Sequence, residues 1–103
     1  MLLHNVYFWL TEEITDEQEV VFREQLAELL KIDLIAHAYW GSPAPTEERP
    51  VTDHSFHTSI GLLFNSQADH DAYQTHPEHQ AFVDRCEGFW AQVKVYDTLL
   101  GED

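Results

Sequence analysis

The segment that most constrains this chain is residues 2–10, in which only His4 and Asn5 are strongly polar. Such a run is typical of a strand that is buried on both faces. Because strand side chains alternate between faces, it presents two rows, one of His4, Val6, Phe8 and Leu10 and the other of Leu3, Asn5, Tyr7 and Trp9. Neither row suits contact with water, so a covering layer is needed on each side.

Turn and capping patterns place the other elements. Thr15 and Gln18 have the spacing of a capping box and predict that a helix begins there. Ser66 can cap a short helix over residues 68–73, and Pro77 suits the first turn of another that ends near Gln92. Apolar and β-branched runs predict further strands at residues 32–41, 54–64 and 93–99.

This order of elements indicates an α+β fold of the ferredoxin-like β-α-β-β-α-β type, with an antiparallel sheet. At 103 residues the chain is expected to form a single domain, residues 1–103. In the strand at 54–64 the even positions, Phe56 among them, are predicted to share a row with Thr58 and Ile60.

Helices on one side of such a sheet leave its other face uncovered. A homodimer in which two sheets pack face to face is the simplest solution. The residues expected in this dimer face are Leu3, Asn5, Tyr7, Trp9, His57, Ser59 and Leu63.

The charge balance bears on possible partners. Five Lys and Arg against 19 Asp and Glu give a net charge of −14. Phosphate backbones and anionic lipid would repel such a chain, so neither nucleic acid nor a membrane is expected as a partner. The start of the sequence lacks the basic region of a signal peptide, and one cysteine, Cys86, fits a reducing compartment. A cytoplasmic location is therefore expected.

Seven histidines raise the question of a metal site. His54 and His57 are three apart on a predicted strand, so they point to opposite faces. His76 and His79 are also three apart, but His76 precedes the helix that carries His79. These spacings favour scattered histidines, and no metal site is predicted. Weak binding of a divalent cation by surface carboxylates stays open.

His4, Tyr73 and His79 are the candidate catalytic residues. The row of His4 is expected to face the helices, and the chain around Tyr73 and His79 should lie over that face. Histidine exchanges a proton near neutral pH, and tyrosine can hydrogen-bond a carbonyl or enolate oxygen. Together they would suit proton abstraction next to a carbonyl. The alternative is that Tyr73 and His79 each hold a helix end in place.

Several short motifs run through the chain. The most specific is YQTHPEH at residues 73–79, where a tyrosine precedes a His-Pro-x-His turn. Others are the histidine and leucine at the two ends of residues 4–10, Tyr39-Trp40-Gly41, Phe89-Trp90, and VKVYD at residues 93–97. Together these motifs resemble the stress-responsive A/B barrel (Dabb) domain family, over about residues 2–98.

The resemblance implies two ferredoxin-like chains that form a dimeric α/β barrel, with a cavity between the sheet and the helices of each. In the plant polyketide cyclase of this family, the counterparts of His4, Tyr73 and His79 carry an aldol condensation without metal or organic cofactor. If these roles apply to this chain, His79 is the general base, Tyr73 the partner of the oxyanion and His4 a positioning group. The implied cavity wall is Val6, Phe8, Phe22, Leu26, Ile60, Phe82, Val93 and Val95.

Three functions remain open at this point. The first is a cofactor-free cyclase or lyase that acts on a small phenolic or polyketide-like carbonyl compound. The second is a non-catalytic, stress-related dimer that binds such a ligand or is purely structural. The third is a cofactor-independent monooxygenase, which would need Trp9, Trp40 and Trp90 to line the cavity.

Overall fold

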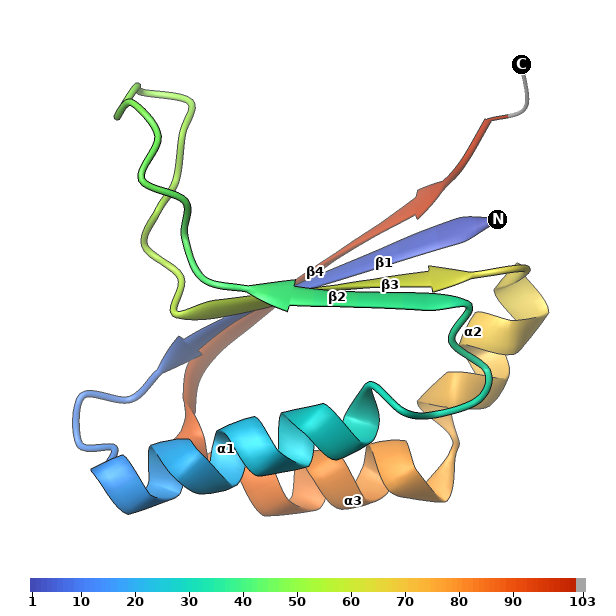
Figure 1. The fold of residues 1–103 in the computed structure, drawn as a ribbon, viewed down its shortest axis with the longest axis horizontal. Coiled ribbons are helices and arrows are strands. Elements are labelled where there is room, and N and C mark those ends of the chain that lie inside the picture. Colours follow the sequence, from blue (N-terminus) through green and yellow to red (C-terminus); the bar gives the residue numbers. More distant parts are fainter. Residues whose placement is uncertain (102–103) are drawn as a thin grey trace.

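The computed structural model of the protein describes residues 1–101, which form one antiparallel sheet with helices over one of its faces (Figure 1). The elements, in chain order, are β1 (Leu2–Leu10), α1 (Asp16–Leu29), β2 (His37–Gly41), β3 (Thr58–Phe64), α2 (Gln67–Gln74), α3 (Pro77–Cys86), the 3-10 turn η1 (Glu87–Phe89) and β4 (Trp90–Leu99).

The strand order β2-β3-β1-β4 is that of a ferredoxin-like sheet, so the predicted α+β fold is confirmed. The strand β1 is central and pairs with β3 on one side and β4 on the other. Val6 lies opposite Ile60 in β3 and opposite Val95 in β4. Residues paired in this way share a face of the sheet, which here is the face that the helices cover.

The predicted helix starts are confirmed. Thr15 and Gln18 form a reciprocal capping box at the start of α1, with side-chain to backbone distances of 3.0 and 3.1 Å. The Ser66 hydroxyl accepts a hydrogen bond from the backbone of Asp69 and caps α2. Pro77 occupies the first turn of α3, where its missing N–H leaves no bond unmade.

Aromatic side chains build the core between the sheet and the helices. The rings of Phe8 in β1 and Phe22 in α1 meet edge to face, with their centroids 5.3 Å apart. Phe82 of α3 lies 6.1 Å from Phe8 and 6.2 Å from Phe22. This cluster holds both long helices against the central strand.

Four predicted boundaries were wrong. The strand expected at 32–41 begins only at His37, because residues 32–35 continue the end of α1 as turns, with the Ile35 amide bonded to the Ile32 carbonyl. The strand expected at 54–64 begins at Thr58. The last helix, expected to reach Gln92, ends at Cys86, and β4 begins at Trp90.

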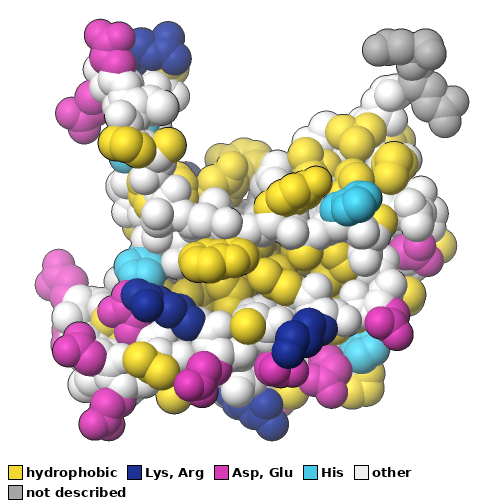
Figure 2. All heavy atoms as spheres, in the orientation of Figure 1, with side chains coloured by type: hydrophobic (Ala, Val, Ile, Leu, Met, Phe, Trp, Pro, Cys, Tyr) yellow, Lys and Arg dark blue, Asp and Glu magenta, His cyan; other side chains and the backbone are white. Residues whose placement is uncertain are grey.

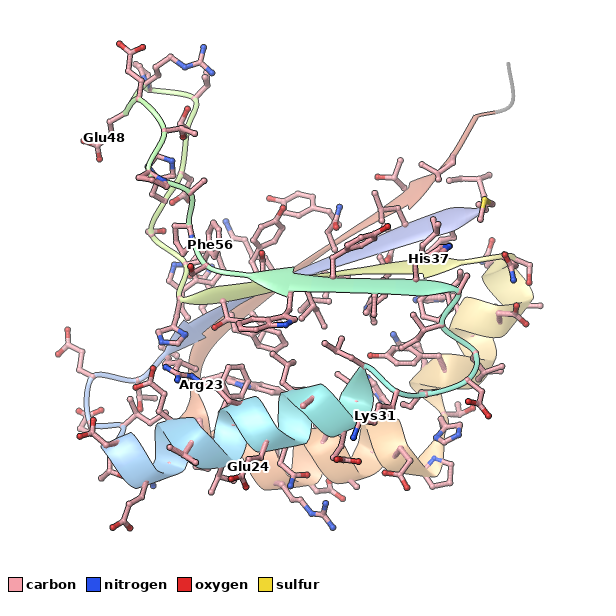
Figure 3. The ribbon with its side chains drawn as sticks, viewed as in Figure 1. Arg23, Glu24, Lys31, His37, Glu48 and Phe56 are labelled. Carbon is pink, nitrogen blue, oxygen red and sulfur yellow. The ribbon has the colours of Figure 1, made fainter. Side chains whose placement is uncertain are left out.

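Because β3 begins only at Thr58, the residues just before it do not alternate between the two faces of the sheet as predicted. Phe56 was expected on the helix-covered face, but its ring lies 5.1 Å from that of Tyr7, on the opposite face (Figure 3). His57 was expected in the dimer face, but its Nε2 lies 2.8 Å from Glu19 of α1. Side chains alternate strictly between the two faces of the sheet only within the strand itself.

The face of the sheet away from the helices is open and rich in aromatic side chains. Tyr7, Trp9 and Phe56 are half-buried there, and Tyr96 is exposed. The loop formed by residues 42–57 and the end of β4 project on this side (Figure 1), with hydrophobic side chains between them (Figure 2). Within residues 1–101, no helix has the length and apolar character needed to cross a membrane.

Replacing Phe22 by alanine is expected to lower the free energy of unfolding by about 3–5 kcal/mol, because it leaves a cavity in the aromatic core. The Phe22 side chain is fully buried. Chemical denaturation followed by circular dichroism measures the change.

The matched control is Val51→Ala in the loop, where the side chain is 81% exposed. It should change stability by less than about 0.5 kcal/mol. Equal losses in both variants would contradict this description of the core.

Candidate functional site

A cavity of about 130 Å³ lies between the sheet and the helices, beside the edge strand β4. We call it the His79 cavity. Its lining residues are His4, Val6, Phe8, Leu29, Ile60, Tyr73, Gln74, His79, Phe82, Val83, Trp90, Val93 and Val95. The wall is therefore largely apolar, with a few polar groups set into it. Val93 and Val95 are themselves partly exposed, so the cavity opens toward solvent along β4.

All three candidate catalytic residues line this cavity, together with six of the eight predicted wall residues: Val6, Phe8, Ile60, Phe82, Val93 and Val95. The exceptions are Phe22 and Leu26. Phe22 fills the core between Phe8 and Phe82. Leu26 lines a second, larger cavity of about 340 Å³ between α1 and the strand β2.

The second cavity was not expected from the sequence. Its other lining residues are Arg23, Ala27, Leu30, Trp40 and Thr58. Arg23 extends from α1 at its edge (Figure 3), and Figure 2 shows hydrophobic side chains between the sheet and α1. Leu26 therefore belongs to this separate cavity.

Each candidate catalytic side chain comes from a different element. His4 lies on the buried face of β1, Tyr73 near the end of α2 and His79 in the first turn of α3. The rings of Tyr73 and His79 meet edge to face with their centroids 4.7 Å apart, and those of His4 and Tyr73 lie 6.0 Å apart. The tyrosine ring thus contacts both histidines.

His4 has a carboxylate partner that sequence reasoning missed. Its Nδ1 donates to Asp97 Oδ1 over 2.5 Å. The register of β1 and β4 places the two residues directly opposite one another. A carboxylate on Nδ1 fixes the orientation of an imidazole ring and determines which nitrogen carries the proton.

Burial sets the protonation states of the three groups. It lowers the pKa of His79 below 6.5, assisted by the neighbouring His4 and opposed by a backbone hydrogen bond at Gln74. Burial also lowers the pKa of His4, although Asp97 opposes this shift. The pKa of the Tyr73 hydroxyl is raised by burial. At neutral pH the cavity therefore holds two neutral imidazoles and a protonated phenol.

Two buried polar atoms on the cavity wall lack a hydrogen-bond partner. They are His79 Nδ1 and Trp90 Nε1, and no other buried side-chain nitrogen or oxygen within residues 1–101 is unsatisfied. Buried polar groups are nearly always paired, so each of these two orphans needs an explanation. Both orphans belong to the same cavity.

The three tryptophans do not meet around the cavity, as a monooxygenase of the kind considered above would require. Trp90 lines the His79 cavity. Trp9 lies on the open face, where its Nε1 donates to Ser55 Oγ over 3.0 Å. Trp40 is 67% exposed on the edge strand β2 and lines the second cavity.

The site also contains residues that the sequence reasoning did not single out as part of it. They are Leu29, Gln74 and, next to His4, His70 and Asp97. Trp90 was expected at the cavity only for a monooxygenase. The sequence could have indicated Asp97, since Val93, Val95 and Asp97 are two residues apart and therefore lie on the same face of their strand. His70 gave no such signal, because its place depends on how α2 docks.

A match to a family model identifies the family. The family model described as the stress responsive A/B barrel domain (Dabb) matches residues 2–99. The chain belongs to this family. Among curated proteins, none is significantly similar to it in sequence.

Solved structures share the fold. A Dabb family protein from Mesorhizobium loti is 26% identical, with 97% of each chain covered and a TM-score of 0.75. A hydroxynitrile lyase from Passiflora edulis is 17% identical, with 99% of this chain and 94% of that chain covered and a TM-score of 0.81. A dimeric ferredoxin-like protein of unknown function from Thermobifida fusca is 17% identical, with 96% and 90% covered and a TM-score of 0.77.

The lowered pKa values of His4 and His79 predict that stability falls on acidification. Below pH 6.5 the unfolded chain binds protons that the folded chain does not, so the free energy of unfolding should decrease from there toward the lower, folded-state pKa. Urea denaturation over a pH series that stays above the titration range of carboxylates measures this.

In His79→Gln one of the two histidines is gone, so the decrease should become smaller but not vanish. The matched control is His37→Gln on β2, where the side chain is exposed. It should keep the wild-type pH profile. If the free energy of unfolding of His79→Gln depended on pH as in wild type, the claim that burial lowers the pKa of His79 would be contradicted.

Proposed function

We propose that this protein binds a small phenolic or polyketide-like carbonyl compound in the His79 cavity and acts on it as a cyclase or lyase, with His79 as general base. The observation that carries the proposal is the pair of unpartnered polar atoms, His79 Nδ1 and Trp90 Nε1, on one apolar cavity wall. We further propose that it works as a cytoplasmic homodimer and needs no cofactor for this chemistry.

The cavity restricts the ligand. Trp90 Nε1 can only donate, so the ligand needs an oxygen or another acceptor near it. The apolar wall favours a hydrocarbon or aromatic body. A volume of about 130 Å³ is comparable to an apolar cavity of about 150 Å³ that holds benzene. One small ring with an oxygen substituent fits. A longer substituent on the ligand would have to extend out of the cavity past Val93 and Val95.

The protonation states support proton transfer. A neutral His79 can take a proton from the carbon next to a carbonyl group, and the protonated Tyr73 can donate a hydrogen bond to the enolate oxygen. The enolate carbon then attacks a second carbonyl carbon, and His79 returns its proton to the new alkoxide. The lyase direction runs these steps in reverse. His4, oriented by Asp97, positions the substrate.

The open face of the sheet supports the homodimer. Its aromatic cluster, which includes Tyr7, Trp9 and Phe56, is typical of an interface core. Structural relatives, including the one from Thermobifida fusca, are described as dimeric. Of the expected dimer-face residues, Leu3, Asn5, Tyr7, Trp9, Ser59 and Leu63 are half-buried in the single chain.

A thermal-shift screen against small phenols, β-diketones and hydroxyaldehydes tests the ligand proposal. Ligands that bind the native state raise Tm. Hits with wild type should weaken by about 1–3 kcal/mol in His79→Gln and Tyr73→Phe, since each variant loses a hydrogen bond to the ligand. Turnover of a hit, followed by chromatography, should fall about 10²-fold or more in His79→Gln.

The control for this screen is His54→Gln, whose side chain lies in the loop and bonds to Thr46. It should keep both binding and turnover. Binding lost in His79→Gln without turnover in wild type would favour the non-catalytic binding protein. Hits that shift all variants equally would contradict a site at His79.

Charge placed on the open face tests the dimer. Tyr7→Asp should convert a dimer to a monomer in light scattering after size exclusion, because the carboxylate would be buried without a partner. Val20→Asp adds the same charge on an exposed position of α1 and should leave the dimer intact. A wild-type protein that is monomeric would overturn the proposal.

A further inference from the structure

Three potential metal ligands from three elements meet beside the His79 cavity. They are His4 of β1, His70 of α2 and Asp97 of β4, and one ligand atom from each lies within 4.8 Å of the others. His4 Nδ1 and Asp97 Oδ1 are 2.5 Å apart, and the rings of His4 and His70 have centroids 5.0 Å apart. An ion bound by all three would displace the proton that His4 Nδ1 shares with Asp97, and this proton would pass to solvent.

His70 has a carboxylate partner of the kind that metal-binding histidines have. Its Nδ1 lies 3.0 Å from Asp71 Oδ1, and a carboxylate there holds the proton on Nδ1. The lone pair is then on Nε2, which accepts a hydrogen bond from the side-chain amide of Gln74 over 3.4 Å, and an ion would take the place of that bond. Histidines that bind metals commonly have such a carboxylate on the second nitrogen. Only 14% of the His70 side chain is exposed, so its position is well defined by its surroundings.

The surroundings suit a cation that comes from solvent. His4 is almost fully buried, whereas the Asp97 side chain is 44% exposed and gives access to the cluster. Two imidazoles and one carboxylate are the donor types that first-row transition metals prefer, whereas Ca²⁺ and Mg²⁺ prefer oxygen ligands. The net charge of −14 raises the local concentration of cations.

We propose that His4, His70 and Asp97 form a binding site for a divalent transition metal ion such as Zn²⁺. The set differs from the histidine pairs considered in the sequence, because it depends on the tertiary fold. Three protein ligands leave a fourth position of a tetrahedral zinc ion open. The site shares His4 and Asp97 with the proposed catalysis, so an ion there would change what the His79 cavity offers a ligand.

Calorimetric titration of the protein, without a histidine tag, with Zn²⁺ alone tests the site. We expect one ion per chain and a higher Tm with Zn²⁺, reversed by a chelator. Titration with Co²⁺ should give visible absorption bands that report histidine and carboxylate ligands. Absence of saturable binding of either ion, with neither Tm nor absorption changed, would overturn the proposal.

Two ligand variants assign the site. His70→Gln and Asp97→Asn should each weaken Zn²⁺ binding by about tenfold or more, since removing even an indirect partner costs that much. Circular dichroism verifies that both remain folded. His37→Gln, on the edge strand β2 (Figure 3), and His79→Gln should bind Zn²⁺ as wild type does. Wild-type affinity in both ligand variants would place the ion elsewhere and refute the assignment.

Discussion

The double pairing of β1 is the constraint on which the rest of the structure depends. Because β3 and β4 flank it, its backbone bonds are satisfied and alternate side chains enter the space beneath the helices. Val6 and Phe8 use that row to build the core, and His4 is carried into the same layer. A histidine at this place is desolvated as a consequence of sheet topology, and Asp97 on β4 compensates only in part.

The polar groups of the His79 cavity are retained at a cost to stability. His79 and Trp90 each bury a nitrogen without a hydrogen bond, and an unsatisfied buried group costs about 1–3 kcal/mol. Tight aromatic packing around Phe8 and Phe22 offsets such costs in a chain of this length. Local features that oppose stability and lie together in one cavity are what the proposed ligand site would require.

Much of the fold could be predicted because its determinants are local. The alternation in residues 2–10 and the caps at Thr15 and Ser66 depend on neighbours in sequence, and the structure has them as expected. The wrong predictions concern features that are set by pairing between strands far apart in the sequence. The strand β3 begins at Thr58, after Phe56 and His57, and their side chains therefore follow the loop rather than the strand alternation.

The sequence by itself determined the family, the element order and the three residues His4, Tyr73 and His79 that line one cavity. Motif spacing and apolar periodicity carry that information along the chain. Only the tertiary structure decided that Phe22 belongs to the core and that Asp97 and His70 join the site. These placements depend on strand register and helix docking, which are set by packing between segments far apart in sequence and leave no local signal.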